Sequence, residues 1–162
     1  MHDPKGCARS LVRAGGQVGL DVDHLSIDGQ VSTFFTGISA QTQGHGDGGN
    51  IDIDARHVEI LSGGAIYATT TGGSGGDIHP RTDDLCIDSQ GIEFFTDIGI
   101  QTQGSGAGGN LVISSQQLEI VNGSSISGSA VSSGAAGSME ISTERASSMP
   151  GIGDQCTYTM VI

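Results

Sequence analysis

Residues 34–50, FFTGISAQTQGHGDGGN, return sixty positions later as residues 94–110, FFTDIGIQTQGSGAGGN. A repeat of this length is typical of a solenoid, because one repeat cannot bury its apolar face without stacking on its neighbours. A functional site on one repeat would look much like the same region of the next. The sequence therefore constrains the architecture of this chain more strongly than its function.

Within each block, apolar residues stand two positions apart, which is the period of a β-strand. Val18 and Leu20 form one such pair, Leu25 and Ile27 form the next, and both pairs recur after 33, 27 and 33 residues. We expect the inward side chains to stack in ladders, such as the row Ile27, Ile60, Ile87 and Ile120. In the row that begins at Leu20, Pro80 has no N–H to donate and predicts a local defect.

A third strand follows each of these double strands, at residues 38–42, 66–70, 98–102 and 126–130. Glycine-rich corners such as residues 46–49 and 106–109 separate the repeats, because glycine adopts positive φ without steric cost. Three strands per coil, stacked in parallel, predict an all-β fold. We expect a right-handed parallel β-helix (a solenoid) of slightly more than four coils, since parallel crossovers are almost always right-handed.

The chain divides into a non-repeat N-terminal flank, β-helix repeats over residues 15–141, and a non-repeat C-terminal tail. With the repeats split into two copies of the sixty-residue block, the bounds are 1–14, 15–74, 75–141 and 142–162. The pattern ends at residue 141 because Ala146 and Ser148 stand where the next strand should be apolar. We expect such a chain to be a piece of a longer solenoid.

The 162-residue chain has six Lys and Arg against eighteen Asp and Glu, a formal net charge of −12. This charge repels phosphate backbones and anionic membrane surfaces, so we expect no nucleic-acid partner. Without a signal-peptide core or an apolar stretch of about 18 residues, we expect no membrane insertion either. Cys7, Cys86 and Cys156 are too few and too scattered for a disulfide scaffold or a C-x-x-C metal site, and their redox state stays open.

Several short motifs have a structural explanation. Residues 44–49 and 104–109 match the G-x-G-x-x-G dinucleotide fingerprint, but a strand follows where that fingerprint requires a helix. Residues 72–76 match G-x-S-x-G at a corner between two strands. His24 and His57 occupy the same coil position and should stack about 5 Å apart, yet two exposed ligands without a third make a poor metal site. We therefore expect no catalytic, cofactor-binding or metal-binding residues, and no cofactor.

Residues 48–53, Gly-Gly-Asn-Ile-Asp-Ile, lead to a strand at 57–60, to Gly-Ala-Ile-Tyr-Ala-Thr-Thr-Thr at 64–71, and to a closing Gly-x-Gly-Gly. This unit resembles the repeats of filamentous haemagglutinin-family exoproteins, the large adhesins of bacterial two-partner secretion systems. The resemblance covers residues 15–141. It implies a β-helical shaft that crosses the outer membrane through a partner transporter and acts in adhesion, outside the cell or on its surface. Since this chain shows no signal peptide and no Asn-Pro-Asn-Gly-type secretion motif, the resemblance implies a shaft segment of a larger parent protein.

The leading hypothesis is a non-catalytic structural or adhesive segment that contacts a host or cell-surface protein or glycan. The longer coils carry extra residues between the second and third strands, and these should project as loops. We place the contacts in these loops, at Phe34, Phe35, Phe94 and Phe95, because exposed aromatic pairs on a polar shaft can anchor a partner. The same phenylalanines could instead fold back over the side of the coils.

Two other hypotheses stay open. Outward carboxylates such as Asp52 and Asp54 suit a β-helical polysaccharide lyase or glycosidase. A lyase also needs a basic residue to take the substrate proton, and among the repeats only Arg56 and Arg81 are basic, with Lys5 far upstream. The third hypothesis is a non-functional gene remnant, because the repeat pattern breaks near the C-terminal end.

Overall fold

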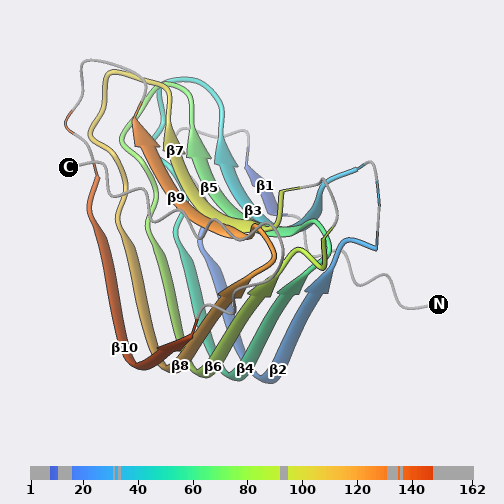
Figure 1. Ribbon diagram of the computed structural model, residues 1–162. Helices are drawn as coiled ribbons and strands as arrows, with labels where there is room; N and C mark the ends of the chain where they lie inside the picture. The colour runs from blue at the N-terminus through green and yellow to red at the C-terminus, as the bar shows by residue number, and fades with distance from the viewer. Residues whose placement is uncertain are drawn as a thin grey trace.

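The computed structural model describes residues 8–10, 16–30, 32, 34–91, 95–130, 135 and 137–147, and the regular elements among them are all β-strands (Figure 1). The long strands are β2 (Val18–Asp28), β4 (Ile51–Leu61), β6 (Ile78–Asp88), β8 (Leu111–Val121) and β10 (Met139–Ser147). The short strands are β1 (Ala8–Ser10), β3 (Thr36–Thr42), β5 (Gly64–Thr70), β7 (Asp97–Thr102) and β9 (Ser125–Ala130).

The strands form two five-stranded sheets in which every pairing is parallel. The long-strand sheet has the order β10-β8-β6-β4-β2, and the short-strand sheet has the order β1-β3-β5-β7-β9. The chain alternates between the two sheets, and we call one long strand with the short strand after it a unit. Unit 1 is β2 with β3, unit 2 is β4 with β5, unit 3 is β6 with β7, and unit 4 is β8 with β9. Strand β10 opens a fifth unit.

The register of the long strands confirms the predicted spacing of the repeat. Val18 pairs with Ile51, Ile51 with Ile78, and Ile78 with Leu111, at steps of 33, 27 and 33 residues. The predicted isoleucine row is also continuous from β2 to β8, through Ile27, Ile60, Ile87 and Ile120. The alternation of apolar residues therefore reports the correct strand register.

The strands β2, β4, β6 and β8 each contain two of the strands predicted from the sequence, joined through a bend that Figure 1 shows near the lower edge of the view. The register between β2 and β4 is continuous except at Asp23 and Arg56, which lie at the bend. The same position is left out between β4 and β6. One unpaired polar residue lets the strand change direction while pairing continues on both sides. A unit therefore has two strands where the sequence predicts three.

The ladder defect predicted at Pro80 is present in β6. Pro80 pairs with Ile53 of β4, whereas the register between β6 and β8 omits His79 and Pro80. Proline has no N–H to donate, so it can occupy a central strand only where a ladder bond is missing. The Pro80 side chain is still buried in its row, so the defect affects the backbone pairing and not the core.

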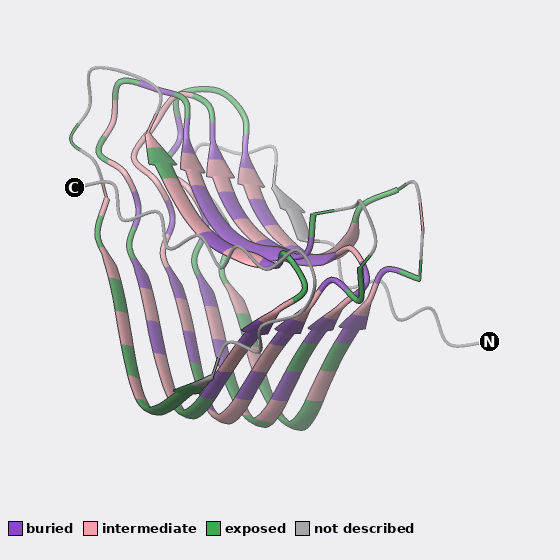
Figure 2. Cartoon of the chain, viewed as in Figure 1, coloured by how far each residue is buried: buried purple, intermediate pink, exposed green. Residues whose placement is uncertain are grey.

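Both sheets contribute to a single apolar core. The short strands supply the row Ile38, Ile66, Ile98 and Ile126, and the long strands supply apolar rows on both sides of the bend. In the middle units these side chains are fully enclosed, with Ile53, Ile60 and Ile66 at 0% exposure. Figure 2 shows buried residues alternating with partly or fully exposed ones along the strands, as the period of two requires.

Glycine is required at the corner before each long strand, because the backbones of adjacent units come into contact there. A Cβ at Gly76 would overlap the carbonyl oxygen of Gly49, and a Cβ at Gly109 would overlap that of Gly76. The complete column is Gly16, Gly49, Gly76, Gly109 and Gly137. The Gly-Gly corners of the sequence thus permit the units to stack closely.

The paired structure extends beyond both predicted ends of the repeat. Strand β1 lies inside the predicted flank 1–14 and pairs with β3, and β10 pairs with β8 as far as Ser147 instead of ending at residue 141. Ala146 lies beside Leu118, so the inward row continues with a smaller side chain. The physical reason is that a ladder is made by main-chain groups and tolerates small or polar side chains in its last positions.

Candidate functional site

The predicted contact loops occupy equivalent positions in units 1 and 3. The first joins β2 to β3 and the second joins β6 to β7, whereas units 2 and 4 make this connection with two or three residues. Both loops open with the same local contact: the Asp28 carboxylate accepts a hydrogen bond from the backbone N–H of Gln30 at 3.0 Å, and Asp88 does the same for Gln90 at 2.7 Å. With unit 2 between them, the loops lie about 10 Å apart along the stack.

The connections of units 2 and 4 are short, with two and three residues. Ser62 and Gly63 both have positive φ, and so do Asn122 and Gly123. Consecutive residues of this kind turn the chain sharply. Gln90 and Gly91 share this conformation in the longer connection of unit 3, so the length of the connection, and not the turn, distinguishes units 1 and 3.

The phenylalanines of the loops differ in exposure. Phe34 is 81% exposed and Phe95 is 83% exposed, whereas Phe35 is 48% exposed. The Phe35 ring lies 6.1 Å from the ring of Tyr67 in β5, tilted by 38°. Phe34 and Phe95 thus project into solvent, and Phe35 folds partly back over the short-strand sheet. Phe94 lies outside the described residues, and a contact role for all four residues stays a prediction.

Tyr67 is held in place by a carboxylate that sequence reasoning missed. The Tyr67 hydroxyl donates a hydrogen bond to Oδ1 of Asp97, which is only 5% exposed. Burial raises the pKa of Asp97, and hydrogen bonds from Tyr67 and Ser127 oppose that rise. Burial, followed by the hydrogen bond to Asp97, also raises the pKa of Tyr67. Tyr67 is therefore neutral, and its ring position is fixed from one side by Asp97.

Gly99 leaves the space that the Tyr67 ring occupies. A Cβ at Gly99, which pairs with Tyr67 in the sheet, would lie 2.6 Å from Tyr67 Cε1. An aromatic ring beside a strand glycine covers backbone that would otherwise be bare. The sequence signal for this arrangement is a Tyr and a Gly at the same position of adjacent short strands.

A depression of about 270 Å³ lies beside this ring on the outer face of the short-strand sheet. Its lining combines the charged Asp97 and the aliphatic Ile100 with uncharged polar side chains, which are Thr69, Gln101, Ser127 and Ser129. The exposed loop phenylalanines, the Tyr67 ring and this hydroxyl-rich surface together form the candidate contact surface. Hydroxyl and amide groups beside aromatic rings can bind a polar, ring-shaped ligand or a protein loop.

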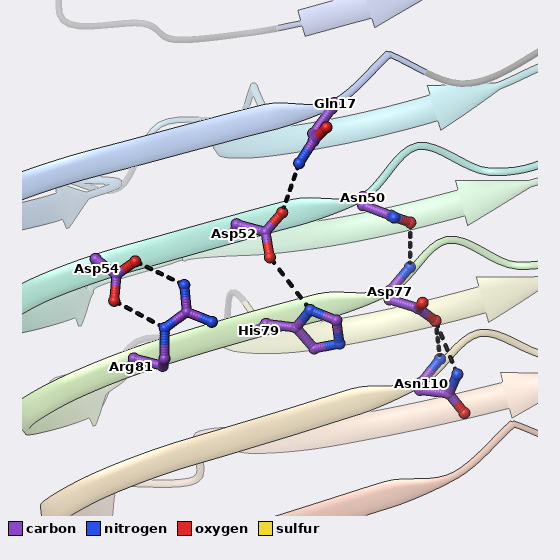
Figure 3. Close-up of polar contacts among 8 residues, drawn as sticks. All are labelled: Gln17, Asn50, Asp52, Asp54, Asp77, His79, Arg81 and Asn110. Carbon is purple, nitrogen blue, oxygen red and sulfur yellow. Dashed lines mark hydrogen bonds and ion pairs between the residues drawn. The ribbon is translucent and has the colours of Figure 1, made fainter.

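The outer face of the long-strand sheet carries paired charges. Arg81 donates two hydrogen bonds to the Asp54 carboxylate, 2.8 Å from Nε and 2.6 Å from a terminal nitrogen (Figure 3). Arg56 donates from the same two kinds of nitrogen to a single oxygen of Asp23, Oδ1, at 3.0 and 2.8 Å. These hydrogen bonds lower the pKa of both carboxylates and raise the pKa of both arginines. Because all four side chains are exposed, the pairs contribute little to stability.

The histidines of this face also meet neighbours on adjacent strands. The predicted stacking of His24 on His57 is confirmed, with ring centroids 4.6 Å apart and planes 26° apart. His57 Nδ1 lies 2.7 Å from the carboxylate of Asp84, and His79 Nδ1 lies 3.2 Å from that of Asp52. Within the described part of the chain, no three His, Cys, Asp or Glu side chains converge as a metal site.

A polar ladder that sequence reasoning missed runs along the corner before the long strands. The Asn50 side-chain oxygen accepts a hydrogen bond from the backbone N–H of Asp77 at 3.0 Å (Figure 3). Asp77 Oδ1 accepts one from the N–H of Asn110 at 2.7 Å, and the Asn110 side chain accepts one from the Ser138 hydroxyl at 2.7 Å. Each of these positions directly follows a corner glycine. This regularity is the signal that could have revealed the ladder.

A second depression, of about 550 Å³, crosses the bend of β4, β6, β8 and β10. Acidic and hydroxyl side chains line it, among them Asp83, Ser115 and Glu144, together with the Asp54–Arg81 pair. The enzyme hypothesis would place its substrate here. Arg81 is protonated and bonded to Asp54, and Arg56 is likewise bonded to Asp23, so neither can take a proton from a substrate at neutral pH.

Cys86 is the cysteine that the structure describes, as a partly buried free thiol on the outer side of β6. Burial, and then the carboxylates of Glu119, Asp88 and Glu59, raise the pKa of Cys86 to about 11. The thiol is therefore protonated at neutral pH and is a weak nucleophile. Cys7 and Cys156 lie outside the described residues.

Comparisons of the chain with protein-family models, with curated protein sequences and with solved structures found no match. In the part of the chain that the structure describes, there is no helix with the length and hydrophobicity to cross a membrane.

Proposed function

We propose that this chain is a non-catalytic structural and adhesive segment, built as a right-handed parallel β-helix of slightly more than four coils. The parallel register supports this architecture, because each sheet gains one strand per unit and equivalent residues lie side by side. The right hand follows from the strong preference of parallel crossovers. In such a rod the bend within each long strand supplies one corner, so that three straight segments enclose the core.

The observation that carries the adhesive function is the exposure of Phe34 and Phe95 in equivalent loops, at 81% and 83%. An exposed aromatic side chain on an otherwise polar and acidic surface is unfavourable in water unless a partner covers it. Two such loops at a fixed separation on a rigid stack can engage one partner at two points. The partner class is a host or cell-surface protein or glycan.

The proposed parent is an exoprotein of the filamentous haemagglutinin family, located outside the cell or on the outer-membrane surface after passage through an outer-membrane transporter. The sequence unit that carries this resemblance coincides with a structural unit. Residues 48–53 form a corner and the start of β4, residues 57–60 lie in β4 after the bend, and residues 64–71 contain β5. This coincidence supports the use of the unit as a shaft repeat.

The adhesive function is tested by the binding of fluorescently labelled chain to intact animal cells, measured by flow cytometry. We expect replacement of Phe34, Phe35, Phe94 and Phe95 by Ser to reduce binding about tenfold or more, since aromatic anchors dominate such contacts. The control is Gln116→Ser with Gln117→Ser, which alters two exposed residues of β8 on the other sheet. Equal binding by the two variants would exclude the loops. Loss of binding to protease-treated cells would indicate a protein partner, and loss of binding to glycosidase-treated cells would indicate a glycan.

The second candidate, a polysaccharide lyase or glycosidase, is favoured by the 550 Å³ depression with its carboxylates. The ion pairs of Arg56 with Asp23 and of Arg81 with Asp54 argue against this candidate, because they occupy the basic residues that a lyase would need. Incubation with pectin-like and other acidic glycans, with and without calcium, tests it directly: release of unsaturated or reducing sugar ends would replace the adhesive proposal by an enzymatic one. Absence of both turnover and cell binding would favour a gene remnant.

A further inference from the structure

The long-strand sheet has two edges, formed by β2 and β10. Among the described residues, β2 pairs only with β4, and β10 pairs only with β8. In the part of the chain that the structure describes, the backbone N–H and C=O groups on the outer edge of each of these strands have no strand partner. Such an edge can add another strand, because main-chain hydrogen bonds do not depend on the sequence of the partner.

The edge of β2 carries outward aspartates but lacks three other features that protect an edge strand, namely short length, proline and inward charge. It is 11 residues long, contains no proline, and has no charged residue at its inward positions. Val18, Leu20 and Leu25 are only partly buried against the core, and Val22 is 39% exposed. Their partners on β4 are covered by strands on both sides and are at most 1% exposed; these are Ile51, Ile53 and Val58. A strand added to β2 would bury the same kind of apolar surface that β2 covers on β4.

The edge of β10 is complementary to the edge of β2. Met139 and Ile141 lie in the same inward rows as Val18 and Leu20, and they are also only partly buried. All strands of the sheet run parallel, so a simple translation along the stack brings β10 of one copy against β2 of the next. The same translation brings β9 against β1, because β1 precedes β2 in the stack as β9 precedes β10.

We propose that a second copy of this chain docks head to tail on the first, with its β10 paired in parallel to β2. A second copy fits this edge better than an unrelated strand, because it supplies partners for both sheets in one register. The two surfaces differ, so the contact is heterologous and leaves a free edge at each end of the pair. The chain therefore assembles into open filaments whose length grows with concentration, and not into closed dimers.

Charges at the bend set the strength of this junction. Inside the chain, Arg56 of β4 bonds Asp23 of β2 at 2.8 Å. Across the junction, the residue in the row of Asp23 is Glu144 of β10. Two carboxylates would therefore face each other at the junction, in the row where Arg56 and Asp23 form an ion pair within one chain. Like charges opposite each other on neighbouring strands oppose pairing, and salt screens them. The junction is thus weaker than the internal pairings and is strengthened by salt.

Sedimentation velocity on the full chain, over a range of protein concentrations at low and high salt, tests the proposal. We expect monomer at low concentration and a series of oligomers that grows with concentration and salt. Glu144→Arg should strengthen association about tenfold, by recreating the Arg56–Asp23 pair across the junction. Leu20→Lys should weaken it by about tenfold or more, because Leu20 lies in an inward row, where the added strand would bury the lysine charge without a partner.

Ser26→Lys is the matched control, since it adds the same charge on the exposed outer side of β2. It should leave association unchanged, and circular dichroism should show that each variant remains folded. Two results would overturn the proposal. One is a chain that stays monomeric at every concentration, also as Glu144→Arg, as would occur if other segments of the chain cover the edges. The other is a set of oligomers that Leu20→Lys leaves intact.

Discussion

Inward and outward positions of one strand should respond very differently to mutation. Ile60 of β4 is 0% exposed and lies in the continuous isoleucine row. We expect Ile60→Asp to unfold the chain, or to lower its free energy of unfolding by about 4 kcal/mol or more, because the charge has no partner in the core. Asp54→Ser should leave the thermal midpoint almost unchanged, since Asp54 pairs with Arg81 at the exposed surface and Ser114 already occupies that row. Thermal unfolding followed by circular dichroism measures the stability of both variants. Equal stability of Ile60→Asp and Asp54→Ser would contradict the strand register.

Asp97 gives stability a pH dependence opposite in sense to that of the surface carboxylates. Burial raises its pKa above 3.8, so the folded chain favours the protonated form. The stability that Asp97 contributes is therefore complete below about pH 3.8 and is lost as the pH rises through the raised pKa. Asp23, Asp52 and Asp54 have pKa values lowered chiefly by side-chain hydrogen bonds. Their contribution is present above about pH 3.8 and is lost as the pH falls through the lowered values.

We expect Asp97→Asn to raise the thermal midpoint near pH 7 and to leave it nearly unchanged near pH 3. The amide removes the desolvated charge and can still accept the hydrogen bond of the Tyr67 hydroxyl. Asp21→Asn, which removes a charge from the exposed face of β2, is the control. A variant that is less stable than the original chain at pH 7 would show that the hydrogen bonds from Tyr67 and Ser127 outweigh the cost of burial.

At the scale of the element, side-chain alternation was sufficient to place the strands but not to define their limits. The strand predicted at residues 38–42 lies in β3, and the rows through Ile27 and Ile38 are continuous. Alternation predicts separate strands on the two sides of Asp23, because a break in alternation shows where side chains change direction and not whether the backbone pairing stops. The extension of β10 to Ser147 was missed for the same reason.

The candidate site was predictable only in part. The projection of Phe34 and Phe95 follows from the extra length of two loops, which is visible in the sequence. The Tyr67–Asp97 hydrogen bond joins a short strand to the first residue of the next short strand, 30 positions later. Its prediction would have required the register of the short strands together with the knowledge that Gly99 makes room for the ring. The alternation of apolar and polar residues alone gives neither the register of the short strands nor the role of Gly99.

The polar ladder at the corners should hold the units in register. Asp77 Oδ1 accepts hydrogen bonds from both the backbone N–H and the side-chain amide of Asn110, at 2.7 and 3.0 Å. We expect Asp77→Ala to lower the free energy of unfolding by about 1 kcal/mol, because it leaves the Asn110 N–H without its acceptor. Asp77→Asn keeps an acceptor oxygen and should be nearly neutral. Urea denaturation measures both variants, and equal losses would assign the effect to the charge of Asp77 and not to the hydrogen bond.

At the scale of the whole molecule, the two sixty-residue blocks should behave as one stack. The boundary between them falls between β5 and β6, yet β4 pairs with β6 across it along the length of both strands. Among the described residues, each strand pairs only with the equivalent strands of adjacent units. We therefore expect local opening to begin at the ends, where a strand has one partner, and to reach the middle last.

Hydrogen exchange followed by mass spectrometry, at a protein concentration low enough to keep the chain monomeric, tests this arrangement. We expect amides in β4 and β6 to exchange about tenfold or more slowly than those in β2 and β10, with no fast-exchanging break near residue 75. The apolar rows support this order, because Ile53 and Ile78 are fully enclosed, whereas Leu20 and Ile141 are only partly buried. Fast exchange in β4 and β6 with slow exchange on either side would mean that the blocks fold as separate bodies. The continuous register, and with it the filament proposed above, would then be wrong.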